Sequence, residues 1–112
     1  MTNFTPGTSE WLNQVQEDIV DPLRVIVDPH HHLWPEGGAL AYGLEDLHGD
    51  TDAGHNIEKT VFIECGASYR TEGPDHLAPL GETEFVASQA LKDPSHLISG
   101  IVAHTDLRRE DL

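Results

Sequence analysis

Three consecutive histidines, His30 to His32, are the residues of this chain whose types and spacing best fit chemistry. They follow the apolar run Val25-Ile26-Val27 and one Asp-Pro pair, at the end of a predicted buried strand. Because residues i and i+2 of a strand point to the same face, we expect His30 and His32 to share a face and His31 to point away from it. In a loop the same residues would be ordinary polar side chains. The sequence therefore predicts half of a metal or substrate site.

Polar residues also follow the next two predicted strands. Glu64 and Cys65 come after the second strand, and His104 and Asp106 come after the third. In a parallel barrel the carboxyl ends of the strands face one another, which makes these side chains candidate partners of the histidines. Glu64 is a candidate third ligand or general base, and a structural carboxylate bonded to a neighbouring loop is the equal alternative.

Structural roles are favoured for the other three of these residues. We expect Cys65 to be a small buried apolar residue, since no second cysteine accompanies it. His104 is expected to satisfy a backbone carbonyl, although it could face the same mouth. Asp106 is expected to cap a helix that starts near residue 105.

Three further side chains are candidates for contact with a substrate. Trp34 follows the histidines closely and is placed to wall the pocket beside them, or simply to cover the mouth of a barrel. Tyr69 and Arg70 lie in a long predicted loop, where a guanidinium group matches the geometry of an anionic substrate. A pair of exposed loop residues is the alternative for these two.

Alternating strands and helices are predicted to position these residues. Apolar runs indicate strands at 24–28, 60–64 and 97–103, and the intervening segments are too long for hairpins, so we expect parallel pairing in a repeated βα order. Helices are predicted from Glu10, after Ser9 as the N-cap, to the Asp-Pro pair at 21–22, and also within 40–47, over 82–92 and from 105 onward. Trp11, Leu12, Val15 and Ile19 would lie along one side of the first helix. We therefore divide the chain into an N-terminal arm and helix, 1–23, and a partial barrel domain, 24–112.

Length and charge limit the classes of partner. The chain has 112 residues, enough for one small domain. Its 6 basic and 20 acidic residues give a net charge of −14, which opposes binding to nucleic acid or to an anionic membrane. A single cysteine and the absence of a long apolar run predict a cytoplasmic protein.

These residues resemble the amidohydrolase-related (amidohydrolase 2) family of the amidohydrolase superfamily, which comprises predicted TIM-barrel metal-dependent hydrolases. The resemblance covers about 24–112. It is carried by several motifs in order: Val-Asp-Pro-His-His-His-Leu-Trp at 27–34, Gly-His-Asn-Ile at 54–57, Thr-Val-Phe-Ile-Glu-Cys at 60–65, Tyr-Arg-Thr-Glu-Gly-Pro at 69–74 and Gly-Glu-Thr-Glu-Phe-Val at 81–86.

The resemblance implies a (β/α)8 barrel in which His30 and His32 help to bind a divalent ion, commonly zinc. In the full-length enzyme the ion would activate water to hydrolyse an amide, ester or lactone of a small-molecule substrate. In such families the remaining ligands and the acidic base come from later strands, so we expect these three βα units to be an incomplete and inactive fragment. Its open sheet edge could drive self-association.

Three alternatives stay open within this interpretation. Related proteins include metal-independent lactonases, in which the same histidines would hydrogen-bond the substrate. His30-x-His32-x-x-Pro35 also matches the pattern of a related group of decarboxylases. A truncated protein without catalytic activity is the third alternative.

Overall fold

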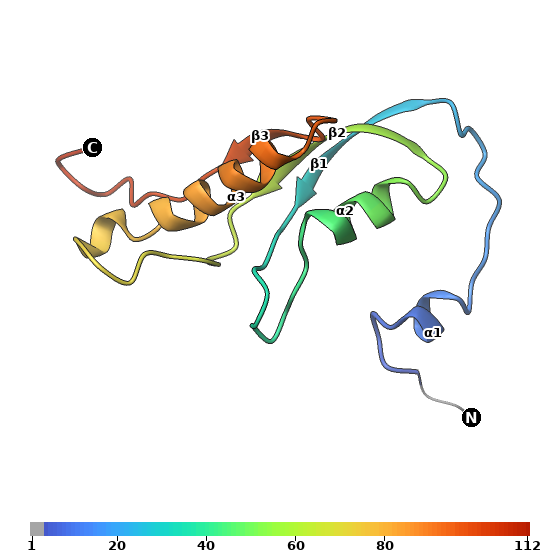
Figure 1. Cartoon of the computed structure of the whole chain (residues 1–112), viewed down its shortest axis with the longest axis horizontal. Helices are drawn as coiled ribbons and strands as arrows, with labels where there is room; N and C mark the ends of the chain where they lie inside the picture. Colours follow the sequence, from blue (N-terminus) through green and yellow to red (C-terminus); the bar gives the residue numbers. More distant parts are fainter. Residues whose placement is uncertain (1–3) are drawn as a thin grey trace.

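The computed structural model describes residues 4–112 and contains one open sheet of three parallel strands. The strands are β1 (Val25–His31), β2 (Asn56–Ile63) and β3 (Ile98–Val102), and they lie in the order β1-β2-β3 (Figure 1). Both pairs of neighbours run parallel, as the sequence predicts. The architecture is a small α/β fold in which helices alternate with the strands.

Two helices cover one face of this sheet. They are α2 (Leu44–Thr51) and α3 (Leu80–Lys92), and a 3-10 turn, η1 (Asp75–Leu77), precedes α3. Leu47 of α2 and Val86 of α3 are buried in the same core as Phe62 of β2. Right-handed crossovers that step in one direction along a sheet place their helices on the same side, which accounts for this arrangement.

The core lies between the sheet and these helices. It is small and built from six buried apolar residues, Leu33, Leu47, Phe62, Val86, Leu97 and Ile98. The opposite face of the sheet has no covering layer in the described part of the chain, and the side chains of Val27 and Val102 are 54% and 47% exposed. The sheet is therefore packed on one face and open on the other.

The predicted N-terminal helix is mostly absent, so that prediction is wrong. Helix α1 (Ser9–Leu12) has four residues, begins after Thr8 rather than Ser9, and is followed by turns and extended chain. Trp11, Leu12 and Val15 are all exposed. Helix α1 lies away from the sheet (Figure 1), so Trp11, Leu12 and Val15 do not pack on it, and of the predicted helix only Ile19, near Gly54, is partly buried. A helix without a surface on which to pack is marginal in water, whatever its amphipathic pattern.

The predicted helix from residue 105 is also wrong. Residues 103–112 form turns and no helix. Asp106 accepts a hydrogen bond from the backbone N–H of Arg108 at 3.1 Å and pairs with the Arg108 guanidinium at 2.8 Å. This carboxylate therefore stabilises a local turn and does not cap a helix.

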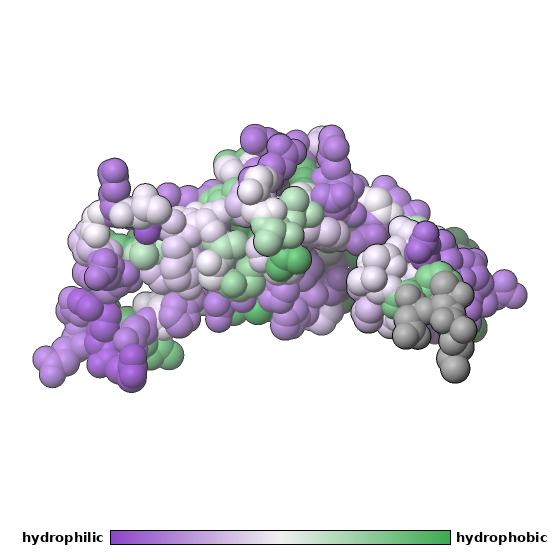
Figure 2. Space-filling model, turned by 90° about the horizontal axis from the view of Figure 1, so that it is seen from below, coloured by the Kyte–Doolittle hydropathy of each residue, from purple (hydrophilic) through white to green (hydrophobic). Residues whose placement is uncertain are grey.

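The other elements differ from prediction only at their ends. Strand β1 continues through the first two histidines, β2 begins four residues earlier than predicted, and α3 begins at Leu80 and not at residue 82. The helix predicted within 40–47 lies at Leu44–Thr51. None of the helices in residues 4–112 has the length and apolar character needed to span a bilayer. The face drawn in Figure 2 is mostly hydrophilic, and its apolar residues lie in small groups.

Candidate functional site

A bulge in β1 sets the direction of the three histidines. Asp28 and His31 pair with β2 residues that are only two apart, so β1 carries one extra residue at this point. Pro29 has no N–H to donate to the sheet, and Asp28 Oδ1 accepts the N–H of His30 at 3.0 Å. Paired residues in a sheet share a face, so His31 lies on the same face as its partner Phe62, which packs in the core. The two flanking histidines lie on the open face.

His30 and His32 meet on that face, which confirms the predicted alternation. Their Nε2 atoms lie 3.3 Å apart, and their rings are nearly perpendicular at 86°. His32 Nδ1 lies 2.7 Å from the backbone oxygen of Ile63, at the end of β2. A carbonyl oxygen can only accept, so this Nδ1 carries a proton. In the neutral ring, Nε2 of His32 then offers a lone pair toward His30.

The geometry of the pair fits a tetrahedral zinc site. Zinc–nitrogen bonds of about 2.0–2.1 Å at tetrahedral angles hold two ligand nitrogens about 3.3–3.4 Å apart. The observed separation of 3.3 Å between the two Nε2 atoms matches this spacing. The carbonyl contact of His32 is also the kind of contact that orients metal-binding histidines. No group of three or more histidine, cysteine or carboxylate side chains converges as a metal cluster in residues 4–112.

His31 has a structural role. It is 8% exposed, and its Nε2 lies 2.9 Å from Thr60 Oγ1. Thr60 Oγ1 donates in turn to the Leu97 carbonyl at 3.4 Å, so His31 Nε2–H is the donor to Thr60. Within the described residues its Nδ1 has no hydrogen-bond partner. Burial lowers the pKa of His31, which keeps the ring neutral in the core.

Glu64 and His104 face each other at the same edge of the sheet as the histidine pair. Glu64 follows β2 directly, and its N–H donates to the Val102 carbonyl at 2.9 Å. Its Oε1 lies 4.0 Å from Nδ1 of His104. The sequence favoured a backbone partner for His104, whereas the structure places its ring beside this carboxylate. Both side chains are partly exposed, at 39% and 47%.

Trp34 lies beside the histidine pair. Its ring centroid is 5.6 Å from that of His32. Its backbone makes two hydrogen bonds with Tyr42, at 2.9 and 3.2 Å, which fold the loop after β1 back on itself. The predicted proximity of Trp34 to the histidines is therefore present.

Tyr69 and Arg70 lie in the loop between β2 and α3. Burial raises the pKa of Tyr69, and the negative charges of Glu82 and Glu64 raise it further. The Arg70 guanidinium is paired with Glu84, and the Arg70 N–H donates to the Ala78 carbonyl at 2.9 Å. Contact of either side chain with a substrate stays a prediction.

Glu82 organises this loop, and sequence reasoning missed it. The residue is 2% exposed and sits in the first turn of α3. Its carboxylate accepts the N–H groups of Cys65 at 3.2 Å and Ala67 at 2.6 Å. Burial raises the pKa of Cys65, and the nearby Glu82 adds to the effect, so the thiol stays protonated. Cys65 is expected to be a small buried apolar residue, and it is half-buried and packed against the core.

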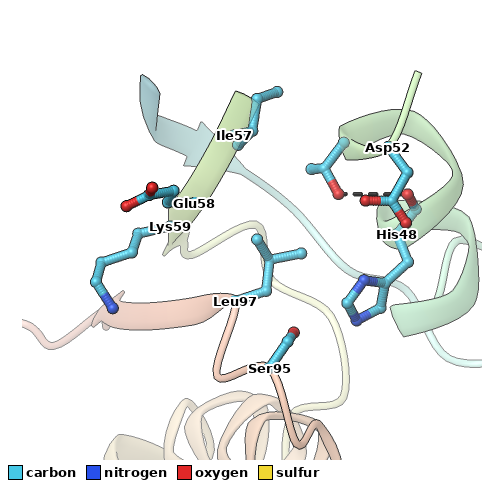
Figure 3. A pocket seen from close by; sticks show the side chains of 8 residues that line it. His48, Asp52, Ile57, Glu58, Lys59, Ser95 and Leu97 are labelled. Carbon is cyan, nitrogen blue, oxygen red and sulfur yellow. Dashed lines mark hydrogen bonds between the residues drawn. The ribbon is translucent and has the colours of Figure 1, made fainter. Parts of the chain in front are cut away.

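A second polar cluster lies near the N-terminal ends of the strands and was also missed. It lines a cavity of about 510 Å³ (Figure 3), into which His48 and Ser95 point. His48 Nε2 lies 3.3 Å from Oδ2 of Asp93, which is 2% exposed. Asp93 also accepts from the N–H of Ser95 at 2.9 Å, the hydroxyl of Ser95 at 2.7 Å and the N–H of Leu97 at 3.0 Å.

These contacts make Asp93 a structural carboxylate. Burial alone would raise its pKa, but the hydrogen bonds from Ser95 and Leu97, with the nearby His48, lower the pKa to about 2. The Ser95 hydroxyl donates to Asp93 and not to His48, so this set of residues does not form a nucleophile activated by a histidine. The cluster instead ties α2 to the loop before β3.

Comparison of the chain with protein-family models, curated proteins and solved structures found no match. The functional argument therefore depends on the geometry of the histidine pair and its neighbours.

Proposed function

We propose that this chain supplies three strands and the histidine pair of a metal-dependent hydrolase of the amidohydrolase-related type, with the sheet continued into a TIM-type (β/α)8 barrel. The observation that carries the proposal is the 3.3 Å separation of the two Nε2 atoms, with His32 held by the Ile63 carbonyl. The parallel strand order and the polar edge at the carboxyl ends of the strands support it.

In this proposal His30 and His32 hold a divalent ion, which we expect to be zinc. Such an ion supplies Lewis acidity that activates water and polarises the carbonyl of an amide, ester or lactone. The Ile63 carbonyl keeps the His32 proton on Nδ1, so Nε2 remains free to act as a ligand. The Asp28 contact fixes the backbone of His30 and so aims its ring at the same point.

Glu64 is proposed as the group that accepts a proton near the reacting carbonyl. It lies at the end of β2, and His104 is 4.0 Å from its carboxylate. His104 is proposed to lie beside this carboxylate in the site as its neighbouring polar group. Trp34, Tyr69 and Arg70 are proposed to contact the substrate, with Arg70 exchanging its Glu84 partner for a substrate anion.

Two imidazoles alone bind an ion weakly, so further ligands must come from strands beyond these three. We therefore propose that these 112 residues by themselves are inactive. Within residues 4–112 no strand pairs with the outer edges of β1 and β3, and these edges are the proposed route of self-association. We also propose a cytoplasmic location, which the free thiol of Cys65 supports.

A metal-independent lactonase is the second candidate, and one observation favours it. At 3.3 Å the two Nε2 atoms are also within hydrogen-bonding distance, so His30 can donate directly to His32 without an ion. On lactone binding, the His30 Nε2–H would turn from His32 to an oxygen atom of the lactone, which can only accept.

Zinc titration by calorimetry separates the two candidates. The first predicts one zinc per chain, with affinity lowered at least tenfold in His30→Gln and in His32→Gln. His96→Gln, at an exposed histidine elsewhere, is the matched control and should bind zinc like the parent protein. Equal zinc binding by all four proteins would reject the metal site. A lactone that binds the parent without zinc, but not His30→Gln, would favour the second candidate.

A further inference from the structure

A cavity of about 600 Å³ lies outside the histidine site, between the loop after β1, the start of α2 and the middle of α3. Three aromatic residues line it: Trp34 and Tyr42, which pair across a short antiparallel bridge, and Phe85 of α3. Residues that pair in this way project their side chains to the same side, so the first two rings stand together. The volume falls within the range of about 300–1,000 Å³ that is typical of small-molecule sites.

The polar lining of this cavity is negative. Glu36, Glu45 and Asp46 contribute to it, together with the amide of Gln89, and no lysine, arginine or histidine does. None of these three carboxylates forms an ion pair with a cationic side chain in residues 4–112. The net charge of −14 adds to the attraction for cations.

The start of α2 does not make the cavity an anion site. The Gly43 N–H already donates to Asp46 Oδ2 at 2.8 Å. Asp46 and Glu45 also place negative charge in the first turn of the helix, where an anion would otherwise be attracted. Tyr42 likewise donates its hydroxyl to Asp50, so this group is engaged, while its half-buried ring packs against the core and lines the cavity.

We propose that this cavity binds an organic ammonium ion. Aromatic faces attract cations through their quadrupoles, and flanking carboxylates add direct charge attraction. A ligand with an apolar body and a quaternary or primary ammonium group matches both features. The cavity lining contains neither His30 nor His32 and shares only Trp34 with the proposed substrate contacts, so ammonium binding does not require the metal site.

Tryptophan fluorescence tests the proposal directly. The chain has two tryptophans, so Trp11→Phe leaves Trp34 as the single indole, and Trp11 is an exposed residue of α1. Titration of this variant with benzyltrimethylammonium should change the Trp34 emission with saturation. Phenylacetate, which has a similar size and the opposite charge, should leave the emission unchanged. Added potassium chloride should weaken ammonium binding.

Substitutions in the same background separate the two contributions. Glu36→Gln with Glu45→Gln should weaken binding about fivefold, since each exposed charge contact contributes modestly to affinity. Phe85→Leu keeps an apolar side chain but removes the ring, and should weaken binding about threefold. Glu72→Gln with Glu110→Gln removes the same charge at exposed sites elsewhere and should change affinity less than twofold.

Three results would overturn the proposal. The first is that the Trp34 emission shows no saturable response to benzyltrimethylammonium. The second is that phenylacetate binds with the same affinity as the ammonium probe. The third is that the two double substitutions weaken ammonium binding equally. Circular dichroism of each variant before titration shows whether the fold is intact, and the charge substitutions lie at exposed side chains that the core does not need.

Discussion

Removal of the buried charge of Asp93 should destabilise the protein and change how its stability depends on pH. The carboxylate is 2% exposed and accepts hydrogen bonds from Ser95 and Leu97, with His48 nearby. These contacts lower its pKa from 3.8 to about 2. The difference corresponds to about 2 kcal/mol of stability above the unfolded pKa. Asp93→Asn should therefore lower the free energy of unfolding by about 2 kcal/mol at pH 7.

The sign of the pH effect follows from the lowered pKa. As the pH falls from 3.8 to about 2, the unfolded chain takes up a proton at Asp93 before the folded protein does. The stability that Asp93 contributes to the folded protein is thus fully present above pH 3.8, and it is lost as the pH falls from 3.8 to about 2. Urea denaturation at several pH values should show a smaller acid-induced loss of stability in Asp93→Asn than in the parent.

The matched control for this experiment is Asp18→Asn, at an exposed residue, which should change stability by less than about 0.5 kcal/mol. The reasoning would be refuted if Asp93→Asn unfolded at the same urea concentration as the parent at pH 7. An unchanged slope of stability against pH in the acid range would refute it equally.

Three further predictions concern the core and the loop after β2. Phe62→Ala should lower the free energy of unfolding by about 3–5 kcal/mol, measured by urea denaturation, because the ring is 1% exposed; a loss below 1 kcal/mol would contradict this. Gly81→Ala should lower the free energy of unfolding by about 1–3 kcal/mol, because an added Cβ would clash with the Ser68 carbonyl oxygen. Gly49→Ala in α2 has free space and should be neutral or stabilising, and the opposite order of the two variants in thermal unfolding would contradict the packing. Cys65 should react with a disulfide reagent at pH 8 more slowly than free cysteine, because its pKa is raised, and faster reaction would contradict the buried environment.

The sheet and the histidine pair were predictable because each depends on a local pattern. Runs of β-branched and aromatic residues mark all three strands, and the spacing between the runs excludes hairpins. The shared face of His30 and His32 follows from alternation along a strand, and it holds although β1 runs three residues further than predicted. The bulge at Pro29 shifts the pairing with β2 but preserves the alternation from His30 to His32.

The missed features depend on contacts between distant segments. The pattern from Trp11 to Ile19 describes one side of a possible helix, but it carries no information about a surface that could cover it. Glu82 and Asp93 bind backbone N–H groups of loops, and any residue in those loops would offer the same donors. No spacing of residue types in the sequence indicates which carboxylate will accept these hydrogen bonds. Glu82 and Asp93 could therefore not be distinguished from other acidic residues near the ends of a helix.

The central claim is that the Nε2 atoms of His30 and His32 bind one divalent ion while Nδ1 of His32 keeps its proton. Nitrogen-15 NMR of the imidazole rings during zinc titration tests it most directly. The proposal predicts that both Nε2 resonances shift together at one zinc per chain, that His32 Nδ1 remains protonated, and that the buried His31 is unaffected. A zinc-induced shift of His32 Nδ1, or shifts confined to other histidines, would contradict it.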